Sequence, residues 1–227
     1  MGKIDDIQAY KEWTEYHRSL KRDKAADNLS PVERKKKLEK LEANVIEWIL
    51  FFFSEFAKYP FTKFHKKAIK RITTNMEWYE VLSWSRELAK STIVFMCMMY
   101  LVLTGKKRNV LLISNSHENA VRLLEPYKKA FESNSMLKAY YGDLREFGSW
   151  TADEFTLNTG ATFRAIGALE SPRGTRKDAV RPDTALVDDF DTDADCRNPD
   201  ILKKKWEWFE EALFPTRSIS EDLLVIF

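Results

Sequence analysis

Apolar residues recur along this chain at two spacings, one typical of helices and one typical of buried strands. Over residues 31–56 they recur every three or four positions, which predicts one long amphipathic helix. Ser30 precedes that stretch and is followed by a proline and by Glu33, so we expect the helix to begin with a capping box. The apolar stripe consists of Leu38, Leu41, Val45, Trp48, Phe52 and Phe56.

Farther along the chain, helical and strand patterns alternate. We expect one helix after Pro60, one over residues 93–103, one that begins at Ser116 and one over residues 199–213. The expected strands are residues 78–82, 109–114, 184–187 and 223–227, with a hairpin formed by residues 154–157 and 162–166. Strands that alternate with helices at these lengths predict an α/β fold with a parallel sheet and crossover helices.

Length and charge set limits on the function. The 227 residues are enough for one large domain or a domain with an appendage. Lysine and arginine total 37 against 35 acidic residues, so a net charge of +2 gives no global field for nucleic acid, and any such surface must be local. Cys97 and Cys196 form no pattern and no signal peptide is evident, which favours a reducing, cytosolic compartment.

Two local basic stretches remain as candidates for such a surface. Residues 34–37 begin the first helix, where a solvated face is the favoured interpretation. The loop carrying Arg173, Arg176, Lys177 and Arg181 is open to three readings: contact with DNA phosphates, contact with a neighbouring subunit's nucleotide, or a plain solvated loop. Residues 1–29 predict a short helix followed by a basic connection.

The strongest candidate for chemistry is the turn between the strand at residues 78–82 and the helix at 93–103. A helix start that follows a strand and a tight turn offers free N–H groups and a positive dipole end to a triphosphate. Lys90 would reach the β- and γ-phosphates, and the Ser91 hydroxyl would ligate Mg²⁺. Trp84 and Ala89 stand where a phosphate loop has glycines, so an ordinary helix start on a solvated surface is the alternative.

A second candidate element lies about a hundred residues downstream. The apolar strand at 184–187 ends in two adjacent acids, which are costly to place there unless they meet a cation or take part in chemistry. Asp188 would hold Mg²⁺ through water opposite Ser91, and Asp189 would orient and activate the attacking water. The alternative is a strand that simply enters a turn.

These elements resemble the large terminase subunits of tailed bacteriophages, the motors that package DNA into procapsids. Residues 85–91 resemble that family's deviant phosphate loop, in which an arginine often precedes the lysine by four positions and the glycines are often replaced. Residues 110–120, the basic approach to Asp188 and residues 223–227 are similar to three further motifs in the same order. The resemblance covers roughly residues 59–227.

The resemblance implies a P-loop NTPase fold of the ASCE/RecA-like type and a set of site residues. Nucleotide-binding residues would be Phe64, His65, Ser85, Arg86, Glu87, Leu88, Ala89, Lys90, Ser91 and Thr92, with Mg²⁺ held by Ser91 and Asp188. Arg86 would stabilise the γ-phosphate, and Asp189 would be the catalytic carboxylate. The family usually has glutamate at the catalytic position, so Asp191 is the alternative to Asp189 as the catalytic carboxylate. His65 stands near the position where the family has a glutamine that contacts adenine.

By this resemblance we expect an ATP hydrolase that drives double-stranded DNA into a procapsid. Its expected partners are a portal protein and a small terminase subunit. We expect it to be a ring when active and a monomer in isolation. We expect it to act without a membrane, in the cytoplasm of the bacterial host. Residues 1–57 would form an N-terminal helical region and 58–227 an ATPase domain truncated before a nuclease domain. A helicase-like DNA-dependent ATPase and a non-catalytic nucleotide-binding docking module are the alternatives.

Overall fold

The computed structural model describes residues 29–57, 60–172, 180–217 and 223–227. The helix expected within residues 1–29 and the residues Arg173, Arg176 and Lys177 of the basic loop lie outside these ranges. Arg181 is described: its guanidinium donates to the backbone oxygen of Arg217 at 3.5 Å.

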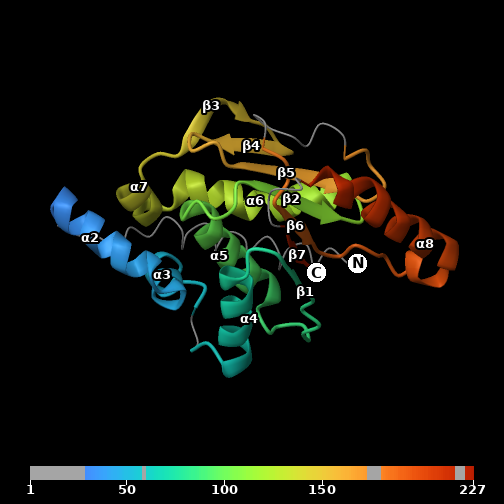
Figure 1. Cartoon of the computed structure of the whole chain (residues 1–227), viewed down its shortest axis with the longest axis horizontal. Coiled ribbons are helices and arrows are strands. Elements are labelled where there is room, and N and C mark those ends of the chain that lie inside the picture. Colours follow the sequence, from blue (N-terminus) through green and yellow to red (C-terminus); the bar gives the residue numbers. More distant parts are fainter. Residues whose placement is uncertain (1–28, 58–59, 173–179, 218–222) are drawn as a thin grey trace, which may run out of the picture.

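The described chain folds around one seven-stranded sheet with the order β1–β7–β6–β2–β5–β4–β3 (Figure 1). The strands are β1 Trp78–Glu80, β2 Asn109–Ser114, β3 Arg145–Trp150, β4 Glu154–Leu157, β5 Thr162–Gly167, β6 Thr184–Val187 and β7 Leu224–Ile226. The first five strands in spatial order are parallel, whereas β5, β4 and β3 pair antiparallel. The expected mixed α/β fold, its parallel sheet and the β4–β5 hairpin are therefore confirmed.

Helices cover both faces of the sheet. They are α2 Pro31–Glu42, α3 Val45–Phe52, α4 Lys63–Thr74, α5 Lys90–Leu103, α6 His117–Ser133, α7 Ser135–Tyr141 and α8 Pro199–Glu207. A π-helical turn, Trp208–Leu213, and 3₁₀ turns at Asp195–Arg197 and Phe214–Thr216 complete the set. Figure 1 shows α5 and α6 against the sheet, α8 at one end, and α2 reaching away at the other.

Strand β2 shows how the sequence separates the two faces. All six of its residues are buried, as expected for a central parallel strand covered on both sides. Val110 and Leu112 belong to the larger core with α5 and α6, whereas Leu111 and Ile113 belong to a second core with Phe209. The uninterrupted apolar run is therefore needed because successive side chains enter opposite layers.

A buried carboxylate fixes the alignment of β2 and β6 at their starts. Asp183, only 7% exposed, accepts backbone N–H bonds from Arg108 at 2.6 Å and Asn109 at 3.2 Å. Burial raises the pKa of Asp183, and those N–H donors oppose the rise. Asp183 thus ties the residue before β6, which spans Thr184–Val187, to the start of β2.

The expected single helix over residues 31–56 is wrong, because the structure has two helices there. The Ser30 capping box forms as expected, but α2 ends at Glu42. Asn44 then begins α3, where its side-chain oxygen accepts N–H bonds from Ile46 at 3.2 Å and Glu47 at 3.4 Å. An asparagine competes with the helical backbone for such bonds, so it starts a new helix with the same apolar spacing.

The helix expected over residues 199–213 also changes form, since α8 ends at Glu207 and a π-helical turn follows. No strand was expected over residues 145–150, where edge strand β3 forms with four exposed residues in succession. Its exposed side chains carry little of the alternation that identifies a half-buried strand.

The N-terminal helices share the main core with the sheet. Trp48 of α3 is fully buried, and its ring lies 5.4 Å from that of Tyr100 on α5. Its indole N–H donates to the Tyr141 hydroxyl at 2.8 Å. One tryptophan thus joins α3 to α5 and α7.

We expect Trp48→Ala to lower the free energy of unfolding by about 3–5 kcal/mol, because it leaves a large cavity and removes the indole N–H bond to Tyr141. Denaturant unfolding measures this loss. The control is Val32→Ala on α2, where the side chain is 65% exposed and a change within about 0.5 kcal/mol is expected. A loss below about 1 kcal/mol in Trp48→Ala would show that α3 is not part of the cooperative core.

Candidate functional site

The turn between β1 and α5 contains two non-glycine residues with left-handed backbone. Ala89, the N-cap of α5, has φ 59° and ψ 27°, in the left-handed region. Glu87 has φ 70°. Left-handed backbone is costly for a residue with a Cβ and easy for glycine. Position 89 is where the phosphate-loop pattern has its second glycine. Ala89 therefore adopts, in place of that glycine, a backbone conformation that glycine favours.

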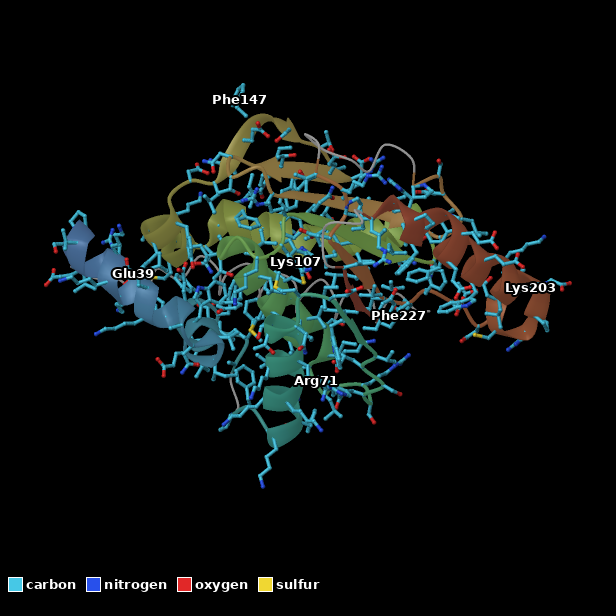
Figure 2. The ribbon with its side chains drawn as sticks, viewed as in Figure 1. Glu39, Arg71, Lys107, Phe147, Lys203 and Phe227 are labelled. Atoms are coloured by element: carbon cyan, nitrogen blue, oxygen red, sulfur yellow. The ribbon has the colours of Figure 1, made fainter. Side chains whose placement is uncertain are left out.

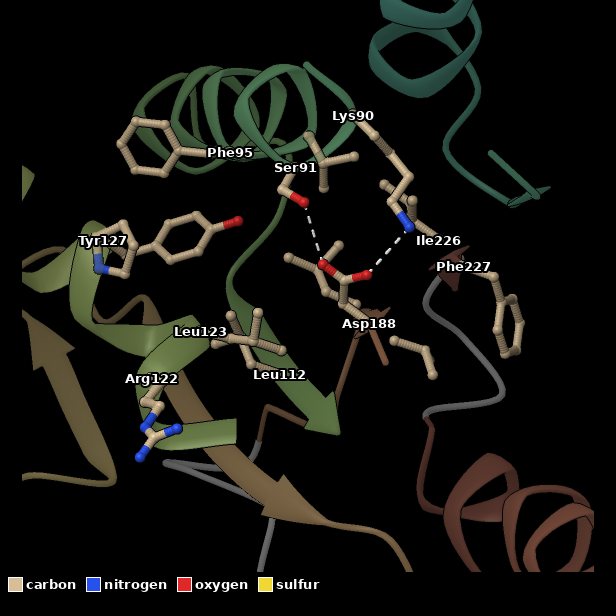
Figure 3. A pocket seen from close by; sticks show the side chains of 14 residues that line it. Lys90, Ser91, Phe95, Leu112, Arg122, Leu123, Tyr127, Asp188, Ile226 and Phe227 are labelled. Carbon is tan, nitrogen blue, oxygen red and sulfur yellow. Dashed lines mark hydrogen bonds and ion pairs between the residues drawn. The ribbon is translucent and has the colours of Figure 1, made fainter. Parts of the chain in front are cut away.

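The start of α5 meets the end of β6 at the carboxyl edge of the sheet. The Lys90 ammonium lies 3.1 Å from Asp188 Oδ1, and the Ser91 hydroxyl donates to Asp188 Oδ2 at 3.2 Å (Figure 3). The side chains of Lys90 and Asp188 are 32% and 26% exposed, respectively. Three residues predicted to act together are therefore in contact, and they remain accessible to a ligand.

Backbone bonds from β2 hold the two adjacent acids. The Asp188 N–H donates to the Ile113 oxygen at 3.0 Å, and the Asp189 oxygen accepts from the Asn115 N–H at 3.1 Å. Asp189 has φ 48°, a second strained position for a non-glycine residue, and its side chain is exposed. The carboxylate of Asp189 is thus carried on a fixed backbone and is open to solvent.

Lys205 is a residue that the sequence analysis missed. Only 4% exposed, it donates to the Phe190 oxygen at 2.7 Å and to Asp195 at 2.6 Å, and lies 3.6 Å from Asp191. It therefore holds the segment that follows Asp189, and it engages Asp191, the alternative catalytic carboxylate. The signal was available: Lys205 lies in the apolar stripe of its helix, four residues before Phe209, where a charge needs partners.

His65 and Phe64 lie beside the loop, where they contact protein groups. The His65 Nδ1 accepts the Thr62 N–H at 3.4 Å, so its Nε2 must be the protonated nitrogen that donates to the Leu88 oxygen at 3.1 Å. The rings of Phe64 and Trp84 lie 5.1 Å apart, and Phe64 is 40% exposed. His65 thus supports the loop, whereas the exposed ring of Phe64 offers a face on which a base could stack.

A cavity of about 130 Å³ opens beside Lys90, Ser91 and Asp188, between α5 and α6. Its deeper walls are apolar, and Figure 3 shows Tyr127 and Arg122 of α6 on the side opposite Lys90. Arg122 pairs with Glu118 at 2.6 Å. Arg86 lies outside this lining, exposed on the turn that precedes α5.

The oxygen atoms at this edge fit a magnesium ion that is shared with phosphates. Mg²⁺ in proteins is held by one or two side-chain oxygens together with waters and substrate phosphates. The Ser91 hydroxyl and the Asp188 carboxylate supply two such oxygens 3.2 Å apart. Within the described ranges, no three histidine, cysteine or acidic side chains converge as a metal site of their own.

Comparisons with known proteins give structural similarity alone. No protein family and no curated protein matches the chain. Among solved structures, the chain is similar to the large terminase of bacteriophage HK97, with 14% identity and a TM-score of 0.44. The match covers 74% of this chain and 33% of the terminase, so the chain spans about a third of that protein's length. Of the helices described, none is long and apolar enough to cross a membrane.

We expect Ala89→Gly to raise the free energy of unfolding by about 1 kcal/mol, because glycine adopts the left-handed conformation without steric cost. Denaturant unfolding checks this. The control is Ala139→Gly inside α7, where glycine should lower the free energy of unfolding by about 1 kcal/mol. Equal losses in both variants would contradict the left-handed assignment at position 89.

We expect Lys205→Met to lower the melting temperature most at neutral pH. The ion pair with Lys205 lowers the pKa of Asp195 to about 2, so the stabilisation is present above the unfolded pKa of about 3.9 and is lost as the pH falls toward 2. The gap between wild type and variant should therefore shrink below about pH 4.

Circular dichroism melts between pH 7 and pH 2 measure this gap. Lys203→Met is the matched control, because Lys203 lies on the same helix as Lys205 and its side chain is 75% exposed (Figure 2). A gap that stays constant across this pH range would contradict the role assigned to the Lys205–Asp195 pair.

Proposed function

We propose that this chain binds ATP with Mg²⁺ at the carboxyl edge of its sheet and hydrolyses it. The observation that carries the proposal is the joint contact of Lys90 and Ser91 with Asp188, which lies 98 residues from Lys90 in the chain. A phosphate-binding lysine, a metal-binding hydroxyl and a metal-binding carboxylate are the parts that phosphoryl transfer requires. The left-handed backbone at Ala89 supports the same assignment.

The sheet order supports a ligand site at this edge. In open α/β sheets, ligands bind outside the carboxyl ends of the strands. Strand β7 lies between β1, which leads into the loop, and β6, which is followed directly by Asp188. The last residue of β7, Ile226, and the residue after it, Phe227, line the cavity beside Lys90. The loop and the acid therefore lie at the same edge of the sheet, with one strand between β1 and β6.

Each residue has a distinct part in this mechanism. Lys90 exchanges its Asp188 partner for phosphate oxygens, and the α5 N-terminus adds its free N–H groups. Ser91 and Asp188 would hold the Mg²⁺, which would give Asp188 a cationic partner in place of Lys90. When bound, Mg²⁺ neutralises developing charge on the phosphates. Arg86, exposed beside the loop, stabilises the γ-phosphate.

Hydrolysis requires an oriented water and a proton acceptor. The water oxygen forms the new bond to the γ-phosphorus, and the bond from that phosphorus to the bridging oxygen of ADP breaks. Asp189 accepts the proton of the water. Asp191 is a weaker candidate for this role, because Lys205 lies 3.6 Å from its carboxylate and competes with a substrate water.

The biological role that we propose is the ATPase domain of a phage or prophage terminase large subunit. It rests on the resemblance of residues 85–91, 110–120 and 181–189 and on the geometry of Lys90, Ser91 and Asp188. In that role residues 58–227 would be the ATPase domain and residues 1–57 would brace it. Double-stranded DNA, a portal protein and a small terminase subunit would be its partners, in a ring in the host cytoplasm.

We expect Lys90→Ala to weaken Mg²⁺-dependent ATP binding at least tenfold, because charge-assisted hydrogen bonds of about 1.5–3 kcal/mol are lost. Isothermal calorimetry on the chain measures the affinity, and Lys40→Ala on α2 is the control with unchanged binding. Equal ATP affinity in Lys90→Ala and wild type would overturn the proposed site. Binding without turnover on DNA would identify a docking module instead of an enzyme.

A further inference from the structure

Helix α4 carries an uncompensated row of positive charge. Its sequence, KFHKKAIKRITT, contains four exposed lysines and no acidic residue. They are Lys63, Lys66, Lys67 and Lys70. None of the ion pairs between described residues involves any of them. The one basic residue of α4 with an acidic partner is Arg71, which bonds the buried Glu80 of β1.

These four lysines lie on one face of the helix. At 100° per residue they fall within about a third of the helix circumference. The opposite face is buried and consists of Ala68, Ile69 and Ile72. Figure 1 shows α4 on the side of the molecule away from β3 and β4. All four lysines of this face are exposed.

The arrangement is unfavourable for the helix itself. Lys63 and Lys67, and likewise Lys66 and Lys70, are like charges at i and i+4, which repel each other. Lys63 and Lys66 also lie in the first turn, where the positive end of the helix dipole disfavours cations. A local arrangement that opposes folding points to a function, because the fold gains nothing from it.

The basic run of α2 differs in two respects. The same helix also carries three acidic residues, Glu33, Glu39 and Glu42. Lys37 lies 4.4 Å from the ring centre of Phe51 and packs on it. The basic run of α2 is therefore a solvated surface, which is the interpretation favoured from the sequence, with Lys37 packed on Phe51. It offers a matched control for α4.

We propose that the lysine face of α4 binds the phosphate backbone of double-stranded DNA. Lys63, Lys67 and Lys70 span about 10 Å of helix axis at 1.5 Å per residue, a length over which duplex DNA presents several phosphates. Lysine ammonium groups are point charges that suit phosphates without reading bases. Protein interfaces are depleted in lysine, which disfavours an acidic protein as the occupant. The inference deepens the proposed motor function and rests on it for the choice of DNA.

The test is the salt dependence of DNA binding. Anisotropy of a labelled duplex of about 30 base pairs is measured with the whole chain from about 50 to about 200 mM NaCl. Replacing three lysines (Lys63→Gln, Lys67→Gln and Lys70→Gln together) should reduce the slope of log K against log salt by about 2.7, since each phosphate contact contributes about 0.9. The control (Lys35→Gln, Lys36→Gln and Lys40→Gln) should keep the wild-type slope.

Several outcomes overturn the inference. They are an unchanged slope in the α4 variant, an equal reduction in the α2 control, or no binding of wild type at low salt. Loss of polyglutamate binding with an unchanged DNA slope would identify an acidic protein instead. The α4 variant should melt close to wild type, because it loses the repulsion between lysines at i and i+4 together with the attraction of Lys67 for Glu80. Lys90→Ala should keep the wild-type DNA slope, so failure of the ATP site and failure of this surface are distinguishable.

Discussion

The contact between Lys90 and Asp188 is the interaction on which the arrangement of the site depends. It joins the first residue of α5 to the first residue after β6, 98 positions later. The contact is possible only because β1, β7, β6 and β2 run parallel, so that the ends of β1 and β6 share one edge. Asp183 at the start of β6 and the Ile113 oxygen at the end of β2 fix where that edge falls. A shift of one residue would turn Asp188 to the other face of the sheet.

The sequence predicts those elements whose pattern is decided locally. Strand β2 and strand β6 are uninterrupted apolar runs, and the expected bounds 109–114 and 184–187 are confirmed. Ser30 and Ser116 cap helices as expected. The spatial order of the strands could not be predicted, because the insertion of β7 between β1 and β6 depends on contacts between distant segments. The break at Asn44 was missed since the apolar spacing continues through it.

In the candidate site, the residues that could be predicted were those placed directly at a helix start or at a strand end. Lys90, Ser91 and Asp188 were expected to act together, and the structure places them in contact. Backbone partners of side chains were not predictable: His65 donates to the Leu88 oxygen. The apolar stripe around Lys205 indicates that its charge needs partners, but not that one of them is the Phe190 oxygen. Backbone oxygens leave no trace in a sequence pattern, so such supports appear only once the fold is known. The roles assigned to Arg86, Phe64 and Asp189 stay predictions.

Helix α4 connects the candidate site to the rest of the molecule at two points. Arg71 bonds Glu80 at the end of β1, and His65 bonds Leu88 within the loop that follows. Burial alone would raise the pKa of Glu80, yet the bonds from Arg71 and Trp78 outweigh it and lower the pKa, so the ion pair stays charged. The helix is therefore tied to both ends of the segment that leads to Lys90.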